Sequence, residues 1–379
     1  MILDAHYLGR KGEVNMPVDK KIKNLRIIVT GGAGFIGSAL VRHIIHSTEC
    51  SVLNVDTLTY AANVSSLAAI ENSPKYNFLK ADIRDANLMT KAFSEFQPDA
   101  IVHLAAESHV DRSIDGPAAF LSTNVNGTYV LLESALAYWN NLGRTQKDRF
   151  RFLHVSTDEV FGSLEEKGLF HEDTPYRPNS PYAASKAAAD HFVRAWGKTY
   201  GLPVLSSNCS NNYGPFQYPE KLIPLAVLNA LHNKIIPVYG QGVNIRDWLY
   251  VEDHARALWT ILTNAQPGEA FNVGGNAERQ NIDLIKSLCG ILDNLQPRGD
   301  GDSYKKLITF VADRPGHDMR YAIDASRIKD RLSWVPEVDL DEGLRRTVAW
   351  YIDNYSWWKP IVKDCYSGER LGLNRSSIP

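Results

Sequence analysis

The chain has 379 residues, of which 44% are hydrophobic and 22% are charged, and its formal net charge is -2. This length suits one large domain or two closely associated ones, and the composition is ordinary for a globular protein with a substantial core. A net charge near zero argues against a general affinity for nucleic acid or anionic membranes. The four cysteines form no C-x-x-C pair. Their wide spacing argues against a zinc site or a disulfide framework and favours a reducing compartment.

Both ends of the sequence are predicted to be loosely attached to the fold. Residues 1–24 are polar and mixed in charge, without the apolar core of a signal peptide, so we expect a flexible extension there. Residues 361–379 are predicted to form a loosely ordered tail. No run in the sequence approaches the roughly 18 apolar residues of a membrane-spanning helix, and we expect a cytoplasmic protein.

A glycine-rich turn follows the first apolar segment. The stretch NLRIIVTGGAGFIGSALVRHII has an apolar run, then Gly31, Gly34 and Gly37, then a helical pattern. A strand, a glycine turn and a helix suit a pyrophosphate, because glycine lets the backbone approach closely and the helix N-terminus supplies free N–H groups. The G-x-x-G-x-x-G spacing alone is a weak signal, since any glycine-rich turn can match it.

An acidic residue stands where a dinucleotide site needs one. Asp56 ends the second predicted strand, CSVLNVDTL, nineteen positions after Gly37. A carboxylate at that spacing can accept hydrogen bonds from an adenosine ribose, and a strand-end cap is the alternative. No Arg or Lys stands near Asp56 in the sequence to bind a 2′-phosphate, so NAD is favoured over NADP.

Further predicted strands alternate with helical segments. NFLKAD, AIVHLAAES and RFLHVSTDE have the apolar runs of buried strands, and AAFLSTNVNGTYVLLESALAYW is helical between the last two. This alternation predicts an α/β fold, a Rossmann-type doubly wound parallel sheet with ligands at the carboxyl ends of its strands. We assign residues 25–210 to this domain and expect residues 252–278 to return to it. Residues 211–251 and 279–360 are assigned to a smaller C-terminal α/β domain.

Two small residues, Ala105 and Ala106, follow the predicted strand AIVHL. Their size would let a nicotinamide ring lie against the backbone at the carboxyl end of that strand. Tight packing of the chain explains two adjacent alanines nearly as well.

Two adjacent carboxylates, Asp158 and Glu159, follow the apolar run RFLHV. Neighbouring side chains of a strand point to opposite faces, and an unpaired buried carboxylate is costly. If Ser156 to Glu159 fall just past the end of the strand, both acids can instead face the ligand crevice. The alternative is a helix N-cap with acids in the first turn, which an isolated S-T-D-E would favour.

Tyr182 and Lys186 are four residues apart in SPYAASKAAADHFVRAWGKTYG and share one helix face. The ordinary pKa of tyrosine is about 10, and a nearby ammonium and a positive nicotinamide ring would lower it. The resulting phenolate could take a proton from a sugar hydroxyl. Tyr and Lys often share a helix face by accident, but the glycine turn and Thr157 after the preceding strand argue against coincidence.

Together these motifs resemble those of the extended short-chain dehydrogenases/reductases, and most closely those of the dTDP-glucose 4,6-dehydratase family. The matching stretches run from about Leu25 to about Tyr355 and are TGGAGFIGSALVRHI, HLAAESHVDRSI, STDEVFG, SPYAASKAAADH, NCSNNYGPFQYPEKLIP, IRDWLYVEDHARAL, FNVGG and DRPGHDMRYAID. Sugar epimerases of the superfamily share the glycines and the Tyr–Lys pair but generally lack the adjacent Asp–Glu. The acid pair is therefore the specific part of the resemblance.

The resemblance implies a lyase that removes water from dTDP-glucose with NAD as cofactor. Oxidation at carbon 4 makes the hydrogen on carbon 5 acidic, and Glu159 would remove it while Asp158 protonates the departing carbon 6 hydroxyl. Tyr182, Lys186 and Thr157 would serve the oxidation. Reduction at carbon 6 regenerates NAD, so we expect the cofactor to stay bound.

The resemblance also implies which residues bind each ligand. The cofactor is predicted to contact Gly31, Gly34, Phe35, Ile36, Gly37, Asp56, Asp82, Ile83, Leu104, Ala105, Ala106, Thr123, Tyr182 and Lys186. The nucleotide sugar is predicted to contact Ser108, Thr157, Asn211, Lys221, Leu222, Pro237, Tyr239, Arg246, Asn281, Arg314 and His317. No metal is expected, and the family implies a homodimer formed through two helices of each subunit.

Alternatives stay open for single residues and for the whole chain. Arg246 beside Asp247 could form a structural ion pair, and His317 could be a loop histidine with a satisfied ring. Without the resemblance, the two interpretations of Asn281 and Tyr239 are close to even. A UDP-glucose 4,6-dehydratase would use the same machinery, and a 4-epimerase is disfavoured by the acid pair. A non-catalytic NAD-binding sensor would predict loss of at least one proposed catalytic side chain.

Overall fold

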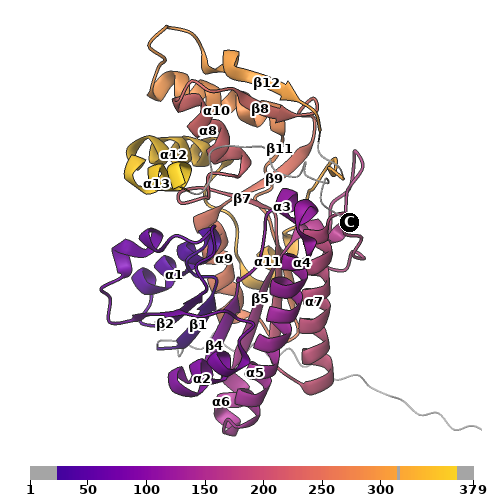
Figure 1. Cartoon of the computed structure of the whole chain (residues 1–379). Helices are drawn as coiled ribbons and strands as arrows, with labels where there is room; N and C mark the ends of the chain where they lie inside the picture. The colour runs from indigo at the N-terminus through magenta and orange to yellow at the C-terminus, as the bar shows by residue number, and fades with distance from the viewer. Residues whose placement is uncertain (1–23, 314–315, 365–379) are drawn as a thin grey trace, which may run out of the picture.

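A parallel sheet of seven strands organises the larger part of the molecule (Figure 1). The structure is a computed structural model that describes residues 24–313 and 316–364. The sheet has the order β10-β6-β5-β4-β1-β2-β3, and each neighbouring pair is parallel. Its strands are β1 (Arg26–Thr30), β2 (Ser51–Asp56), β3 (Tyr76–Lys80), β4 (Ala100–His103), β5 (Arg151–Thr157), β6 (Val204–Cys209) and β10 (Ala270–Val273). The predicted doubly wound parallel sheet is confirmed.

Helices cover both faces of this sheet because its strands alternate their apolar side chains. Ile27 and Val29 of β1 pack in a cluster with α1, α9 and α11, whereas Ile28 packs in a cluster with α2, α5 and α7. These helices are α1 (Phe35–Ser47), α2 (Ala86–Phe96), α5 (Thr128–Asn140), α7 (Pro181–Tyr200), α9 (Val251–Asn264) and α11 (Ser326–Leu332). Apolar side chains on both faces make the strands nearly continuous hydrophobic runs, as parallel sheets require.

The helical segment after β4 is not one regular helix. It consists of α4 (Pro117–Phe120), a π-helical stretch η2 (Leu121–Gly127) and α5. The wider π turn turns Asn124 inward, where its amide donates to Ser185 Oγ at 2.9 Å and pairs with the backbone of Glu107. Thr123, in the same stretch, lines the ligand cavity described below. Such π turns often occur at functional sites.

A second unit lies beyond the carboxyl ends of the sheet strands (Figure 1). Its strands are β7 (Asn211–Tyr213), β9 (Ile245–Tyr250) and β11 (Glu278–Gln280) in one small sheet, and the parallel pair β8 (Ile236–Tyr239) and β12 (Ile308–Val311). Its helices are α8 (Leu222–Leu231), α10 (Asn281–Leu295), α12 (Leu340–Asp353) and α13 (Tyr355–Asp364). Aromatic side chains such as Tyr213, Trp248 and Tyr351 fill its separate core.

We propose the division into two domains from these separate cores. β10 pairs with β6 at one edge of the large sheet, and α9 packs in the same core as α1, where residues 252–278 were expected. One boundary needs correction, because Ala325, Ile328 and Trp334 pack in the first core although residues 279–360 were assigned to the second domain. The chain thus returns to the large sheet twice, and no spacing rule indicates the second return.

Short elements complete the described chain. They are η1 (Val64–Ile70), α3 (Val110–Asp115), α6 (Arg144–Arg149), η3 (Asp158–Phe161) and η4 (Tyr304–Leu307). The predicted extension up to residue 23, Arg314 and the tail from residue 365 lie outside the described residues, whereas α13 continues to Asp364. No helix in the described ranges is long and apolar enough to cross a membrane.

Candidate active site

The glycine turn joins β1 to α1 with no space for side chains. Gly31 has a φ of +73°, and a Cβ on it would lie 2.6 Å from the backbone nitrogen of Ala105. A Cβ on Gly37 would collide with the carbonyl oxygen of Gly31. Tight packing, the alternative explanation for Ala105, is therefore present here. Ala105 and Ala106 also line the cavity above the turn.

Asp56 supports the same turn from the end of β2. Its Oδ2 accepts a hydrogen bond from the backbone N–H of Ala33 at 2.9 Å, and its Oδ1 accepts one from Leu58 at 2.8 Å. Burial raises the pKa of this carboxyl, and both backbone bonds lower it. The strand-end cap considered for Asp56 is therefore formed. The same residue also lines the cavity, so the cap does not remove it from the predicted ribose site.

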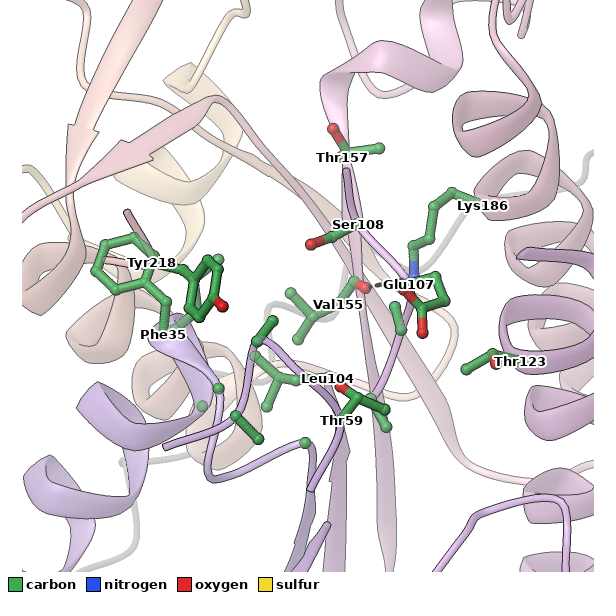
Figure 2. Close-up of a pocket in the computed structure, with 18 of the residues that line it drawn as sticks. Phe35, Thr59, Leu104, Glu107, Ser108, Thr123, Val155, Thr157, Lys186 and Tyr218 are labelled. Atoms are coloured by element: carbon green, nitrogen blue, oxygen red, sulfur yellow. Dashed lines mark hydrogen bonds between the residues drawn. The ribbon is translucent and has the colours of Figure 1, made fainter. Parts of the chain in front are cut away.

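A cavity of about 380 Å³ opens over the carboxyl ends of the central strands. Every residue predicted to bind the cofactor lines it, as do the acid pair and Thr157. Figure 2 shows Lys186 and Thr123 on the side of α7 and η2, and Phe35 and Tyr218 on the opposite side. The structure therefore gathers into one space residues that come from seven separate segments of the chain.

The acid pair lies directly after β5, which runs to Thr157 and so ends two residues later than expected. The Thr157 hydroxyl oxygen accepts a hydrogen bond from the backbone N–H of Glu159 at 3.3 Å and caps the short helix η3. The N-cap interpretation is thus correct as local geometry. Both acids nevertheless line the cavity, because the cap turns the chain at the rim of the sheet. The N-cap interpretation and the crevice interpretation of these two acids are therefore compatible.

The surroundings of Asp158 favour its protonated form. Its side chain is 2% exposed, and burial raises its pKa well above the ordinary value, with the charges of Glu159 and Asp247 acting in the same direction. Arg246 and a 3.3 Å hydrogen bond from Thr157 oppose this shift. Its Oδ2 is buried without a hydrogen-bond partner among the described residues. A neutral carboxyl with a free oxygen in a cavity is suited to donate a proton.

Tyr182 and Lys186 project from one face of α7 into the same cavity. Burial raises the pKa of Tyr182 well above its ordinary value, and Glu159 adds to this shift, whereas the Thr157 hydroxyl lowers it. The expected lowering by Lys186 is not found, since burial is the largest influence on the pKa of Tyr182. The Lys186 ammonium donates to the carbonyl oxygen of Val155 at 2.9 Å (Figure 2). In the protein alone, Tyr182 is therefore a weak acid that stays protonated at neutral pH.

A second cavity of about 200 Å³ adjoins the first and extends into the smaller domain. Glu159 lines this cavity too. The residues predicted to bind the substrate that line it are Ser108, Asn211, Lys221, Leu222, Pro237, Tyr239, Arg246, Asn281 and His317. Oδ1 of Asn211 and Oδ1 of Asn281 are buried without hydrogen-bond partners in the described ranges. Buried polar atoms normally find partners, so these two mark where a polar ligand would complete the structure.

The alternatives for Arg246 and His317 have separate outcomes. Asp247 does not serve as the main partner of its neighbour, because its oxygens accept hydrogen bonds from the backbone of Gly275 and Ala277 at 3.1 and 2.6 Å. Arg246 donates to the carbonyl oxygen of Asp318 at 2.9 Å, and its guanidinium lies over the Tyr321 ring. His317 is within 2.7 Å of Asp313 Oδ1, so its Nδ1 has the partner that the loop interpretation required.

Sequence reasoning missed a cluster between the two cavities. The Glu220 carboxylate accepts hydrogen bonds from Arg112 Nε at 2.9 Å and from the Tyr60 hydroxyl at 3.1 Å, and the Arg112 guanidinium lies over the Tyr60 ring. Glu220 lines both cavities. Arg112 and Glu220 lie in stretches that carried the family resemblance, but no spacing rule joins them to Tyr60. The cluster links the two domains.

Comparisons with known proteins agree with this geometry. A sequence profile of the family described as GDP-mannose 4,6 dehydratase matches residues 28–347. A probable dTDP-glucose 4,6-dehydratase from Sinorhizobium fredii is 59% identical over 349 residues, which cover 92% of this chain and 99% of that protein. The structure of a dTDP-glucose 4,6-dehydratase from Streptomyces venezuelae, solved with NAD bound, is 44% identical with a TM-score of 0.81, over 89% of this chain and 100% of that chain.

An epimerase is similar in fold but more distant in sequence. The UDP-glucose 4-epimerase of Thermotoga maritima, solved with UDP-glucose, has a TM-score of 0.77 and 28% identity over 87% of this chain and 99% of that chain. The chain belongs to the dTDP-glucose 4,6-dehydratase family, NAD-dependent lyases of the extended short-chain dehydrogenase/reductase superfamily.

Proposed function

We propose that the protein converts dTDP-glucose to dTDP-4-keto-6-deoxyglucose and water, with an NAD that stays bound. The observation that carries this proposal is the proton inventory of one cavity. It holds Asp158, whose surroundings favour the protonated carboxyl, a second carboxyl, Glu159, and the pair Tyr182 and Lys186. Oxidation alone needs only the last two residues. A separate acid and base are needed only if water is also eliminated.

The residues around the glycine turn fit NAD. Gly31 and Gly34 line the cavity without a side chain, so a pyrophosphate could approach their backbone, and α1 begins directly behind the turn. Asp56 lies at the end of the neighbouring strand, where a ribose would be held. NAD would supply oxidation of carbon 4 and reduction of carbon 6. The nicotinamide end would lie toward Tyr182 and Lys186.

Tyr182 is the proposed base for the oxidation. After losing its own proton, Tyr182 would accept the proton of the carbon 4 hydroxyl on its phenolate oxygen, and Thr157 beside it would orient that hydroxyl. The high pKa of Tyr182 in the protein alone means that it becomes an effective base only when positive charge is brought near. Lys186 and the charged nicotinamide ring are the two sources of that charge.

Glu159 and Asp158 are the proposed pair for the elimination. Glu159 lines both cavities and would take the proton from carbon 5 of the sugar. Asp158 would give its proton to the hydroxyl that leaves carbon 6. The two carboxyls differ in surroundings, since Asp158 is buried and Glu159 is only partly so, and different surroundings separate the roles of paired carboxyls.

The second cavity is the proposed site of the nucleotide. Arg246 offers a planar guanidinium suited to the diphosphate, and the unpartnered oxygens of Asn211 and Asn281 offer acceptors for sugar or base. Preference for the thymine base rests on the high identity to relatives that are named for dTDP-glucose. UDP-glucose is the alternative substrate.

The decisive experiment is a mass spectrum of the products formed from dTDP-glucose and from UDP-glucose, with no NAD added. We expect loss of one water from the dTDP sugar alone, because the purified protein should retain its cofactor. Loss of water from UDP-glucose would make that sugar the substrate. Unchanged mass with inversion at carbon 4 would indicate an epimerase, and an untouched sugar would indicate a binding protein.

We further propose a homodimer formed through α5 and α7. Aromatic side chains lie exposed on these two helices, with Tyr129 42% exposed, Phe192 37% and Tyr200 50%. All three surround Trp196, with ring centroids 5.3 to 6.0 Å from it. An apolar cluster of this kind on adjacent helices is suited to pack against its own copy.

A cytoplasmic location is proposed because Cys50, Cys209 and Cys289 are free thiols.

Phe192→Glu is expected to weaken this dimer about tenfold or more, because it places a charge in an apolar contact. Sedimentation equilibrium of the wild-type protein and the variant measures the change. Phe310→Glu is the matched control, since Phe310 is 52% exposed on β12, away from α5 and α7. A wild-type protein that sediments as a monomer, or equal weakening by both variants, would contradict the proposed surface.

A further inference from the structure

A buried polar network lies behind Lys186, on the side away from the cavity. Asp190 is one helical turn after Lys186 on α7 and is 6% exposed. Its Oδ1 lies 3.0 Å from His154 Nε2, and its Oδ2 accepts hydrogen bonds from Ser156 at 2.8 Å and Tyr176 at 2.9 Å. The Lys186 ammonium is 3.4 Å from the same His154 nitrogen.

The protonation states in this network follow from its geometry. Burial lowers the pKa of His154 to about 4, so the ring is neutral at pH 7. Its Nδ1 is buried without a partner among the described residues, which is the place for the unprotonated nitrogen. Nε2 then carries the hydrogen and donates it to Asp190. Burial raises the pKa of Asp190, but His154, Lys186 and Ser156 together lower it by more. The net shift is downward, so Asp190 stays ionised.

Few charges face the Lys186 ammonium from the surrounding elements. Asp190 lies on α7 with Tyr182, and the neutral His154 and His103 lie on β5 and β4. Cys209 on β6 has a pKa raised to about 12 and is a neutral thiol. Glu107, Asp158 and Glu159 line the open side of the cavity. Asp190 is thus the ionised carboxylate on the closed, buried side of the lysine.

We propose that Asp190, held in place by His154, is the buried counter-charge that keeps Lys186 protonated and positioned beside Tyr182. Asp190 is a positioning residue, because it touches neither the cavity nor the reacting groups. The arrangement explains why four donors converge on this carboxylate inside the protein, namely His154, Ser156, Tyr176 and, at 3.5 Å, Asn208 Nδ2. A buried ammonium is otherwise unstable and tends to lose its proton. The inference rests on the proposed function only for the role of Lys186 in the reaction.

The test compares urea unfolding of the wild-type holoenzyme, Asp190→Asn, Lys186→Met and the double variant between pH 6 and pH 9. In Asp190→Asn the folded protein keeps a buried ammonium without its counter-charge, so the pKa of Lys186 falls further below that of the unfolded chain. Such a group binds fewer protons when folded, and stability rises with pH through that window. We therefore expect the stability deficit of Asp190→Asn to narrow as the pH increases.

Two further stability measurements distinguish the loss of the Asp190 charge from the loss of its hydrogen bonds. The double variant should lose less stability than the sum of the two single variants, because it buries neither charge. Tyr176→Phe removes one donor to the same carboxylate but leaves its charge, so its deficit should not change with pH. A deficit of Asp190→Asn that is constant with pH and additive with Lys186→Met would overturn the proposal.

The activity of the same variants gives an independent reading. Turnover of Asp190→Asn should fall about 10- to 100-fold at pH 7, with the alkaline limb of its pH profile moved to lower pH and the substrate KM nearly unchanged. If Asp190→Asn does not fold, recovery of folded protein in the double variant supports the proposal and equal failure overturns it. If the wild-type protein dehydrates no sugar, the proposed function fails while the unfolding experiment still decides this inference.

Discussion

Glu159→Gln is expected to reduce turnover by roughly 100- to 10,000-fold, the range typical of a positioned proton-transfer group. Glutamine keeps the size of the side chain but cannot take a proton from carbon 5. Oxidation at carbon 4 does not need Glu159, so the first half of the reaction should proceed. The bound cofactor should therefore accumulate in its reduced form after substrate is added, which its near-ultraviolet absorbance measures in stopped flow.

The matched control for this variant is Glu166→Gln, which makes the same change at an exposed position of the loop after η3. It should turn over like the wild-type protein. Removing the charge of Glu159 also removes one cause of the high pKa of Asp158, but burial is the larger cause, so Asp158 should remain protonated. Normal turnover of Glu159→Gln would refute the role of Glu159 as the base.

Tyr182→Phe is expected to stop the reaction one step earlier, with a loss of turnover of roughly 100- to 10,000-fold. The phenolate form of Tyr182 is the proposed acceptor of the carbon 4 hydroxyl proton, and phenylalanine has no group to replace it. The ring still packs at the base of the cavity, near Phe120, so the fold should be retained. In contrast to Glu159→Gln, no reduced cofactor should accumulate when substrate is added.

Tyr355→Phe is the matched control, because Tyr355 is 49% exposed on α13, outside both cavities. Substrate binding to Tyr182→Phe, followed by calorimetry, should be close to that of the wild-type protein. Accumulation of reduced cofactor in Tyr182→Phe would show that another group accepts the first proton. The pair of variants thus places oxidation and elimination on different residues by one spectroscopic signal.

The sequence by itself determined the parts of the site that depend on local spacing. The glycine turn and Asp56 follow from their spacing along the first strand, helix and second strand, and the Tyr182–Lys186 pair follows from the period of a helix. The adjacency of Asp158 and Glu159 needs no structure at all. These residues line one cavity, because the carboxyl ends of parallel strands meet at one edge of the sheet.

Only the tertiary structure decided the protonation of these groups and the partners that come from distant segments. The pKa of Asp158 is raised by its burial and by the charge of Glu159, and the pKa of Tyr182 is raised mainly by its burial. Neither burial nor the orientation of Lys186 toward Val155 can be inferred from spacing. Three further features join segments that lie far apart in the chain. They are the hydrogen bonds from Arg112 and Tyr60 to Glu220, the contact of Asp190 with His154, and the packing of residues 325–334 in the first core. Such contacts depend on how whole domains pack, and desolvation depends on the packing as well.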